Sequence, residues 1–84
     1  MTEPTNTLAR FQSIKQVSAG EITEIVDAGC YVRDADGTAT LRIYPPDMTA
    51  RYAPKVGDYW MVYDGDGYQS ISPREAFLIG YVAA

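Results

Sequence analysis

The chain has 84 residues, which suffices for one small domain and excludes a large enzyme that closes over its substrate. Seven basic and eleven acidic residues leave a formal net charge of −4, which excludes the basic surface that a binder of duplex nucleic acid needs. One cysteine and no histidine exclude an internal disulfide framework, imidazole-bound zinc and histidine-assisted catalysis.

The residue types that favour strands dominate this composition. β-branched and aromatic residues are abundant, whereas leucine and lysine, which are common in helices, are scarce. Seven glycines and five prolines supply turns for several short strands, so the composition predicts a mainly β fold. The N-terminal sequence MTEPTNTLARF lacks the features of a signal peptide, and no apolar run is long enough to cross a bilayer. We therefore expect a soluble cytoplasmic protein with a reduced thiol.

The first residues predict a tail rather than part of the fold. Residues 1–7 are polar and predict a flexible N-terminal tail, and residues 8–84 predict a single small β-rich domain. Apolar residues then recur at a spacing of three, at Leu8, Phe11, Ile14 and Val17. This spacing fits a short amphipathic helix, and an irregular lead-in with a short strand around residues 14–17 is the alternative. The pattern alone does not separate the two.

A β-hairpin is the best-supported unit of the first half of the chain. Strand patterns run through residues 21–33, where Ala28 and Gly29 are expected to bend or bulge the strand. The sequence Asp-Ala-Asp-Gly at residues 34–37 predicts a tight turn, because aspartate and glycine tolerate a left-handed backbone. Residues 38–44 are expected to form the returning strand.

Prolines separate this hairpin from the second half of the chain. Pro45 and Pro46 end the returning strand, because neither can donate to a β-ladder. The elements expected next are a connection or short edge strand (47–54), a turn (55–58), a strand (59–63), a second Asp-x-Asp-Gly turn (64–67) and a strand (68–72).

A short helix is expected near the C-terminus. Ser72 is placed to cap it, Pro73 fits its first position, and Glu75 is placed to bond back to the cap. Phe77 contributes to its apolar side, and Gly80 is expected to stop it in a left-handed conformation. The fold class predicted is therefore mainly β (α+β), a small antiparallel sheet or partly closed barrel of about five strands with a short C-terminal helix.

The predicted core centres on the strand at residues 59–63, which is apolar on both sides. Its contacts are expected to join Trp60, Val62, Ile71 and Phe77 to Leu41 and Ile43. Because a two-turn helix is expected to leave one side of this strand uncovered, the small size of the domain indicates a partner, unless the segment from Leu8 to Val17 covers that side.

No catalytic, cofactor or metal site is expected. The two Asp-x-Asp-Gly segments lack the first carboxylate and the final glutamate of a calcium loop, so they are interpreted as hairpin turns. Cys30 lies on a predicted strand and has no histidine to activate it, so we expect a buried small side chain. The remaining carboxylates lie in turns or at the helix start, and an enzyme is not expected.

The seven tyrosines are the strongest indication of a recognition surface. If Leu41 and Ile43 point inward, their neighbours form a mixed patch of arginine and tyrosine on the outer face, able to stack on or pair with a flat anionic ligand or a protein surface. The candidate binding residues are Arg42, Tyr44, Arg51, Tyr52, Tyr59, Tyr63 and Tyr68. An ordinary solvated face is the alternative.

The last third of the chain resembles the closing segment of small uncharacterised proteins encoded by tailed bacteriophages and prophages. The residues that carry the resemblance are VGDYWMVY (56–63), DGY (66–68), SISP (70–73), AF (76–77) and GY (80–81). The resemblance covers residues 55–81 and weakens toward the N-terminus. It implies a phage accessory protein that acts in the cytoplasm of an infected bacterium, and it says almost nothing about activity.

Three functions follow as hypotheses. The first is a non-catalytic accessory protein that binds a protein partner or itself, as a homo-oligomer, and inhibits or sequesters a host defence or replication component. The second is a sponge for a small anionic ligand such as a nucleotide, and the third is a minor virion or assembly component.

Overall fold

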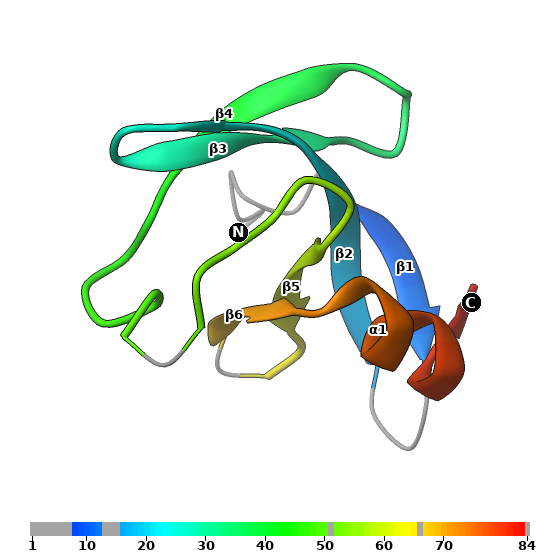
Figure 1. Ribbon diagram of the computed structural model, residues 1–84. Coiled ribbons are helices and arrows are strands. Elements are labelled where there is room, and N and C mark those ends of the chain that lie inside the picture. Colours follow the sequence, from blue (N-terminus) through cyan, green and yellow to red (C-terminus); the bar gives the residue numbers. More distant parts are fainter. Residues whose placement is uncertain (1–7, 13–15, 51, 66, 84) are drawn as a thin grey trace.

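One long strand, β2 (Gln16–Val26), belongs to two antiparallel sheets and joins them (Figure 1). The structure is a computed structural model, and it describes residues 8–12, 16–50, 52–65 and 67–83. The other elements are the strands β1 (Ala9–Gln12), β3 (Gly29–Arg33), β4 (Ala39–Ile43), β5 (Tyr59–Tyr63), β6 (Gln69–Ser72) and β7 (Val82–Ala83), and the helix α1 (Arg74–Gly80).

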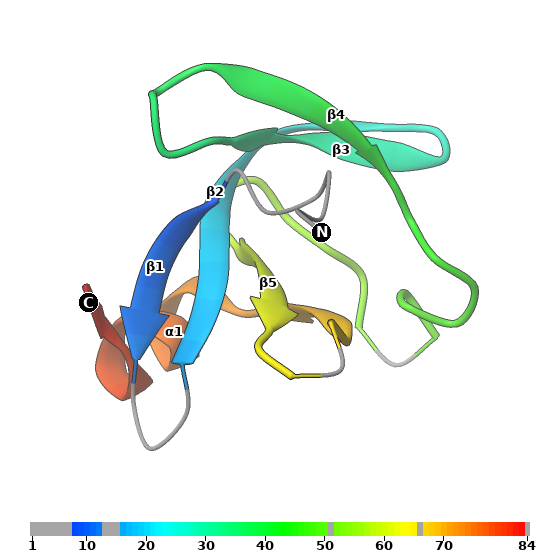
Figure 2. The same ribbon diagram turned by 180° about the vertical axis from the view of Figure 1, so that it is seen from behind.

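The two sheets use different parts of β2. Its N-terminal part pairs with β1 on one edge and with β5 on the other, and β7 and β6 extend this first sheet. From Ile22 onward it pairs with β3, which pairs with β4 to complete the second sheet. A shift in register between Ile22 and Glu24 marks the change. Both views show the second sheet lying across one end of the first (Figures 1 and 2).

Gly20 permits a close backbone contact where the sheets meet. A Cβ atom at this position would lie 2.2 Å from the backbone oxygen of Arg33, at the end of β3, and 2.9 Å from Cδ2 of Leu8. Because the first of these atoms belongs to the backbone, a side chain here would force the two strands apart.

The predicted fold class is confirmed. The described residues form a mainly β structure with one short C-terminal helix, and the sheet is open, which is the first of the two forms expected. There are seven strands where the sequence predicts about five, because β1 and the two-residue β7 have no strong pattern. Among the described residues, no helix is both long and apolar enough to cross a membrane.

Of the two alternatives for residues 8–17, the helix is wrong, and Val17 lies in a strand as the other alternative expects. β1 forms a hairpin with β2 that pairs Ala9 with Ala19, and Val17 belongs to the second strand of that hairpin. Four apolar residues at a spacing of three fit a helix only if no turn interrupts them. Ile14 lies outside the described residues, and so does the predicted tail at residues 1–7.

The expected bend at Ala28 and Gly29 is also wrong. Asp27 and Ala28 form the turn of a hairpin between β2 and β3, in which Val26 pairs with Gly29. Glycine is needed here for a different reason, because a Cβ atom on Gly29 would lie 2.1 Å from the backbone oxygen of Arg42.

Two hydrophobic clusters lie on opposite sides of β5. The first cluster consists of Leu8, Ile22, Cys30, Val32 and Trp60, with Tyr44, Met48, Val62 and Ile71 packed against it. The second consists of Val17, Ala19, Met61 and Phe77, with Tyr59, Tyr63 and Tyr81 packed against it. The alternating side chains of β5 therefore supply both clusters.

The helix covers the second cluster with few residues. Phe77 is fully buried, and its ring stacks on Tyr59 with the ring centroids 4.1 Å apart. Tyr81 stacks on Phe77 from the other direction, at 5.0 Å. The inference that so short a helix leaves one side of β5 bare is therefore wrong, and the domain does not need a partner to cover this strand.

The side chains of β4 that point inward are the ones that the sequence predicts to point outward. Leu41 and Ile43 are 45% and 61% exposed, whereas Arg42 and Tyr44 lie on the inner side. The register explains this, because Arg42 pairs directly with Cys30, which is fully buried. Directly paired residues share a face, so the inward position of Cys30 fixes that of Arg42. Leu41 and Ile43 thus stand outside the predicted core.

The start of α1 also differs from the prediction. Pro73, not Ser72, is the residue before the helix, and the Ser72 hydroxyl donates to the backbone oxygen of Pro73 at 3.2 Å. The N–H of Arg74, at the start of the helix, donates instead to Oδ1 of Asp58, 3.1 Å away. Gly80 lies inside the helix and is not among the glycines with positive φ, and Tyr81 ends the helix with extended backbone.

Asp58 connects four parts of the chain. Its carboxylate is buried, and besides Arg74 it accepts the Tyr52 hydroxyl at 2.7 Å and the N–H of Lys55 at 2.9 Å. Its backbone oxygen accepts the N–H of Ile22 in β2 at 2.7 Å. A buried carboxylate with three donors is stable where an unpaired one is not.

We expect Asp58→Ala to lower the free energy of unfolding by about 2–4 kcal/mol, because three donors lose their acceptor and α1 loses its cap. Urea unfolding followed by Trp60 fluorescence measures this change. Glu75→Ala is the matched control, and it should cost less than about 0.5 kcal/mol. An equal loss of unfolding free energy in Glu75→Ala would instead support the local capping box that the sequence predicts.

A second prediction concerns the way in which α1 covers β5. Phe77→Ala should cost about 3–5 kcal/mol, since it empties the space between Tyr59 and Tyr81. Ile79→Ala, on the same helix at 87% exposure, should change stability by less than about 0.5 kcal/mol. Thermal melts of both variants test this. Comparable losses of stability in the two variants would contradict the conclusion that Phe77 alone holds the helix against β5.

Candidate functional site

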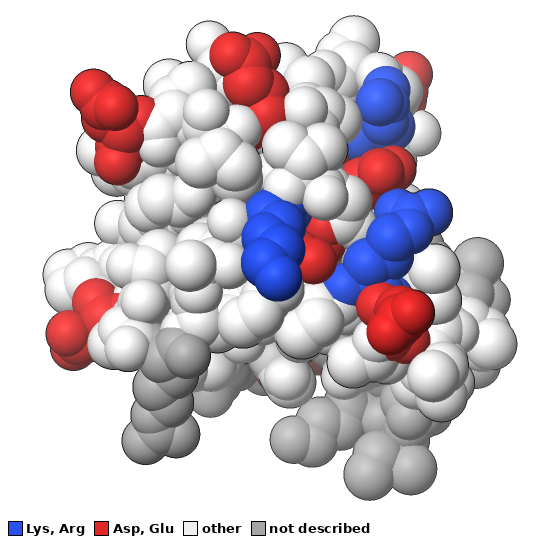
Figure 3. All heavy atoms as spheres, viewed as in Figure 1, with Lys and Arg blue, Asp and Glu red and all other residues white. Residues whose placement is uncertain are grey.

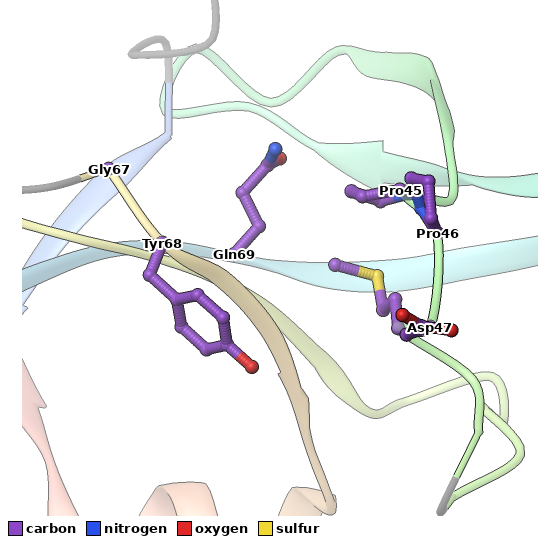
Figure 4. Close-up of a pocket in the computed structure, with 7 residues that line it drawn as sticks. Pro45, Pro46, Asp47, Gly67, Tyr68 and Gln69 are labelled. Carbon is purple, nitrogen blue, oxygen red and sulfur yellow. The ribbon is translucent and has the colours of Figure 1, made fainter.

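A groove runs between the loop that follows β4 and the strand β6. It consists of two adjoining hollows of about 480 and 580 Å³. Both hollows are lined by Asp47, Met48, Tyr68 and Gln69, so we treat them as one site and call it the loop–β6 groove. Figure 4 shows residues of its first hollow: Pro45, Pro46 and Asp47 lie across from Tyr68 and Gln69.

Consecutive turns hold the loop wall of the groove. The N–H of Met48 donates to Pro45 O and that of Ala50 to Asp47 O, each at 3.2 Å. The Met48 side chain packs against the first hydrophobic cluster. Asp47 has φ of 69°, in the left-handed region that aspartate adopts more readily than most residues other than glycine and asparagine. The turns of this loop therefore hold the Asp47 carboxylate at the groove.

The opposite wall is attached to the core. The indole Nε1 of Trp60 donates to Oε1 of Gln69 at 3.1 Å, which fixes the amide of Gln69. The turn before β6 is closed by a hydrogen bond from Tyr63 N–H to Tyr68 O at 2.8 Å. Tyr68 is 64% exposed, and its ring meets that of Tyr63 edge to face at 5.9 Å. An exposed aromatic ring and an oriented amide thus follow each other in the chain, and their side chains point in different directions (Figure 4).

A stack of three side chains lies in the first cluster, behind this wall. Tyr44 and Trp60 are nearly parallel, with ring centroids 6.1 Å apart, and the guanidinium of Arg42 lies 5.9 Å from the Trp60 centroid. Arg42 also faces Asp34 at 3.9 Å, and both side chains are about one-tenth exposed. Burial lowers the pKa of Arg42 and raises that of Tyr44, since it disfavours the charged form of each.

The structure distributes the predicted binding residues over three places. Arg42 and Tyr44 lie inside, so their predicted outer-face position is wrong, and Arg51 lies outside the described residues. The other four are divided between the groove and the second cluster. Tyr52 and Tyr68 line the groove, while Tyr59 and Tyr63 pack in the second cluster.

Tyr52 is restrained at the edge of the groove. Its hydroxyl donates to Asp58, and this hydrogen bond raises the pKa of Tyr52 because the phenol must stay protonated to donate. Of the predicted residues that the structure describes, Tyr52 and Tyr68 come together in one hollow of the groove, where Ser70 and Ile71 of β6 also line it.

Sequence reasoning did not single out Pro45, Met48 or Gln69 as site residues. The hairpin turn at residues 64–67 could have placed Gln69, because it sets the pairing of Val62 with Gln69, next to Trp60. For Met48 the chain offers no signal, since its position depends on turns in an irregular loop.

The lining favours neutral or hydrogen-bonding ligands. Asp47 is the one charged residue among the described residues that line the groove, and the others are apolar side chains, hydroxyls and an amide. The described residues contain no group of three or more side chains suited to hold a metal. The face seen in Figure 3 shows acidic and basic side chains interleaved, with no extended patch of one sign.

No family model, curated protein or solved structure matches the chain significantly.

The environment of Cys30 yields a prediction of low reactivity. The thiol is fully buried, and burial raises its pKa, so less thiolate exists at any pH below that value. We expect an aromatic disulfide reagent at pH 8 to modify native Cys30 at least about a hundredfold more slowly than the urea-unfolded chain. The control is Ala35→Cys in a Cys30→Ser background, which places the thiol in an exposed turn. Equal rates for the two native proteins would contradict the buried site.

Proposed function

We propose that this chain is a non-catalytic accessory protein that binds an extended segment of a protein partner in the loop–β6 groove. The observation that carries the proposal is that an exposed ring, Tyr68, and an amide fixed by the core, Gln69, both line the groove, with side chains that point in different directions (Figure 4). Aromatic rings give a large contact area at low cost in side-chain entropy, and an amide both donates to and accepts from a peptide backbone.

The opposite wall supports an extended peptide as the ligand. Pro45, Pro46 and Met48 present apolar surface across from Tyr68. Grooves lined by aromatic and apolar side chains hold extended or polyproline-type segments, whose backbone groups remain available for hydrogen bonding. The carboxylate of Asp47 adds one acceptor and selects for a donor or a positive charge at that end.

These features favour a protein segment over the alternative of a nucleotide sponge. Among the lining residues that the structure describes, an anionic ligand would meet Asp47 and no lysine or arginine. Arg42, which the sequence offers to an anion, already faces Asp34 and the Trp60 ring. A binding role also fits this lining better than catalysis, because its described residues give Asp47 no second titratable carboxylate, thiol or amine.

The biological setting belongs to the proposal as well. The resemblance to small phage-encoded proteins covers residues 55–81 and includes Tyr68 and the start of β6 in the groove wall. We therefore place the protein in the cytoplasm of an infected bacterium, where it would inhibit or sequester a host component. A role as a minor virion component would instead be detected by mass spectrometry of purified particles.

The test uses a displayed library of unstructured twelve-residue peptides, selected on the wild-type protein. Tyr68→Ala should weaken the selected peptides at least about tenfold, since an exposed aromatic anchor contributes more than 1.4 kcal/mol at such sites. Leu78→Ala, on the helix and half exposed, is the matched control and should bind as wild type. Binding followed by titration calorimetry, with melting temperatures alongside, gives the numbers.

Two results would contradict the proposal. The first is a library that yields no binder to the folded protein, and the second is a set of binders indifferent to Tyr68. Titration with adenosine and guanosine nucleotides in the same calorimeter tests the sponge, for which micromolar binding would be the supporting result.

A further inference from the structure

The loop–β6 groove is lined by an unpaired strand edge as well as by side chains. β6 pairs with β5 on one side, and among the described residues it pairs with no strand on the other. Gln69, Ser70 and Ile71 of β6 line the second hollow, and the loop wall with Asp47 lies across from the strand (Figure 4). The free edge of β6 therefore lies at the groove.

The hydrogen bonds between β5 and β6 show which backbone groups point away from β5. Tyr63 donates to Tyr68 O at 2.8 Å, and the register of the two strands continues from there without a shift. In an antiparallel pair, residues that exchange hydrogen bonds alternate with residues that do not. The backbone groups of Ser70 therefore point toward β5, whereas those of Gln69 and Ile71 point away from it.

The other side of β5 agrees with this assignment. The N–H of Ile22 in β2 donates to Asp58 O at 2.7 Å, so the even-numbered residues of β5 direct their backbone groups toward β2. The odd-numbered residues are left to pair with β6, as the hydrogen bond from Tyr63 requires. The N–H and C=O groups of Gln69 and Ile71 are thus directed to the free edge of β6.

The side chains beside these groups favour apolar residues in a ligand. A residue placed opposite Gln69 or Ile71 in an added strand would share their face of the sheet. On that face Ile71 and Met48 pack against the first cluster, and Met48 also lines both hollows. Two ligand residues separated by one other residue are therefore expected to be apolar.

The charge at the groove favours a basic ligand. Asp47 is exposed, lines both hollows and takes part in none of the ion pairs between described residues. The chain as a whole carries a net charge of −4, which attracts a cationic segment at long range. A lysine or arginine beside the apolar residues would therefore complement Asp47.

The shape of the groove favours a single extended segment over a folded partner. The loop wall lies across from β6, so a strand within a second copy of the chain would bring the rest of its sheet against that loop (Figure 4). A second copy would also add another net charge of −4. A polyproline-type segment fits less well, because proline has no N–H to donate to the outward C=O groups of β6.

We propose that the segment bound in the loop–β6 groove adds to β6 as a further strand, with apolar residues at two alternate positions and a lysine or arginine next to them. Its backbone exchanges hydrogen bonds with Gln69 and Ile71, and its cation lies at Asp47. This inference rests on the proposed function and adds the conformation and composition of the ligand. Main-chain hydrogen bonds give such a complex its affinity, and the side chains give it selectivity.

An N-methyl scan of the tightest peptide from the displayed library tests the addition of a strand. Each peptide of the scan carries one methylated backbone nitrogen, and calorimetry gives its Kd. Methylation at two positions separated by one residue should weaken binding at least about tenfold, because it removes a hydrogen bond and places a methyl group against β6. The nitrogen between them points away from β6, so its methylation should change Kd by less than about threefold.

Amide hydrogen exchange, followed by nuclear magnetic resonance, tests the same contact on the protein. Saturation with the peptide should slow exchange at Gln69 and Ile71 at least about tenfold, since their N–H groups gain acceptors. Leu41 is the matched control, because its N–H also points outward from an edge strand. Tyr44 donates to Ala28 O, which directs the backbone groups of even-numbered residues of β4 toward β3. Exchange at Leu41 should not change.

Asp47→Asn tests the cation. Asparagine tolerates the left-handed backbone and removes the charge, so binding should weaken at least about fivefold at low salt and lose most of its salt dependence. Glu75→Gln, which removes an exposed carboxylate of α1 outside the groove, is the matched control and should bind as wild type. Thermal melts of both variants establish that they are folded.

Failure of this inference differs from failure of the proposed function. Peptides that depend on Tyr68 but tolerate N-methylation at every position, or that leave exchange at Gln69 and Ile71 unchanged, support the groove and overturn the added strand. Equal binding to Asp47→Asn and to the wild type overturns the cation. A library that yields no binder contradicts the proposed function, and this inference fails with it.

Discussion

The buried carboxylate of Asp58 is the interaction on which the arrangement of the second half depends. Through it the loop at Tyr52, the turn at Lys55 and the first turn of α1 share one acceptor group. Its backbone oxygen attaches the same point to Ile22 in β2, where the two sheets diverge. Helices of seven residues have little stability of their own, so α1 depends on this cap and on Phe77 to stay against β5. The position of Tyr52 at the edge of the groove and the cover of the second cluster therefore depend on a single side chain.

The second constraint is the division of β2 between two sheets. Gly20 allows the backbones to approach, and the register shift after Ile22 turns the strand toward β3. The inner face of the second sheet thereby comes to lie over Trp60, which Arg42 and Tyr44 cover. The outer face of that sheet is left to solvent, and with it the edge of β4. The position of the groove thus follows from one bent strand, because the groove lies beside the enclosed face.

Local sequence patterns predicted the helices, strands and turns well, but they predicted poorly which side chains point into the core. The turn at residues 34–37, the strand Tyr59–Tyr63 and the existence of the C-terminal helix follow from short-range backbone preferences, and all are present. The described part of the predicted turn at 64–67 is a turn as well. The facing of Leu41, the cap of α1 and the position of Met48 depend on contacts between distant residues. Hydrophobicity placed Leu41 inside, but the pairing of Arg42 with Cys30 overrides it. Ser72 and Glu75 match a capping box, yet a carboxylate sixteen residues from Arg74 supplies the cap.

At Asp47 the residue that would be best for stability differs from the one that would be best for the proposed ligand recognition. It is the one residue other than glycine that has positive φ among the described residues, and it lines both hollows of the groove. Glycine would relax that backbone and remove the carboxylate in the same step. Selection for a more heat-resistant chain would therefore favour losing the side chain, whereas selection for discrimination between ligands would keep it. The residue found at this position in any variant of the chain thus reports which of the two pressures has acted.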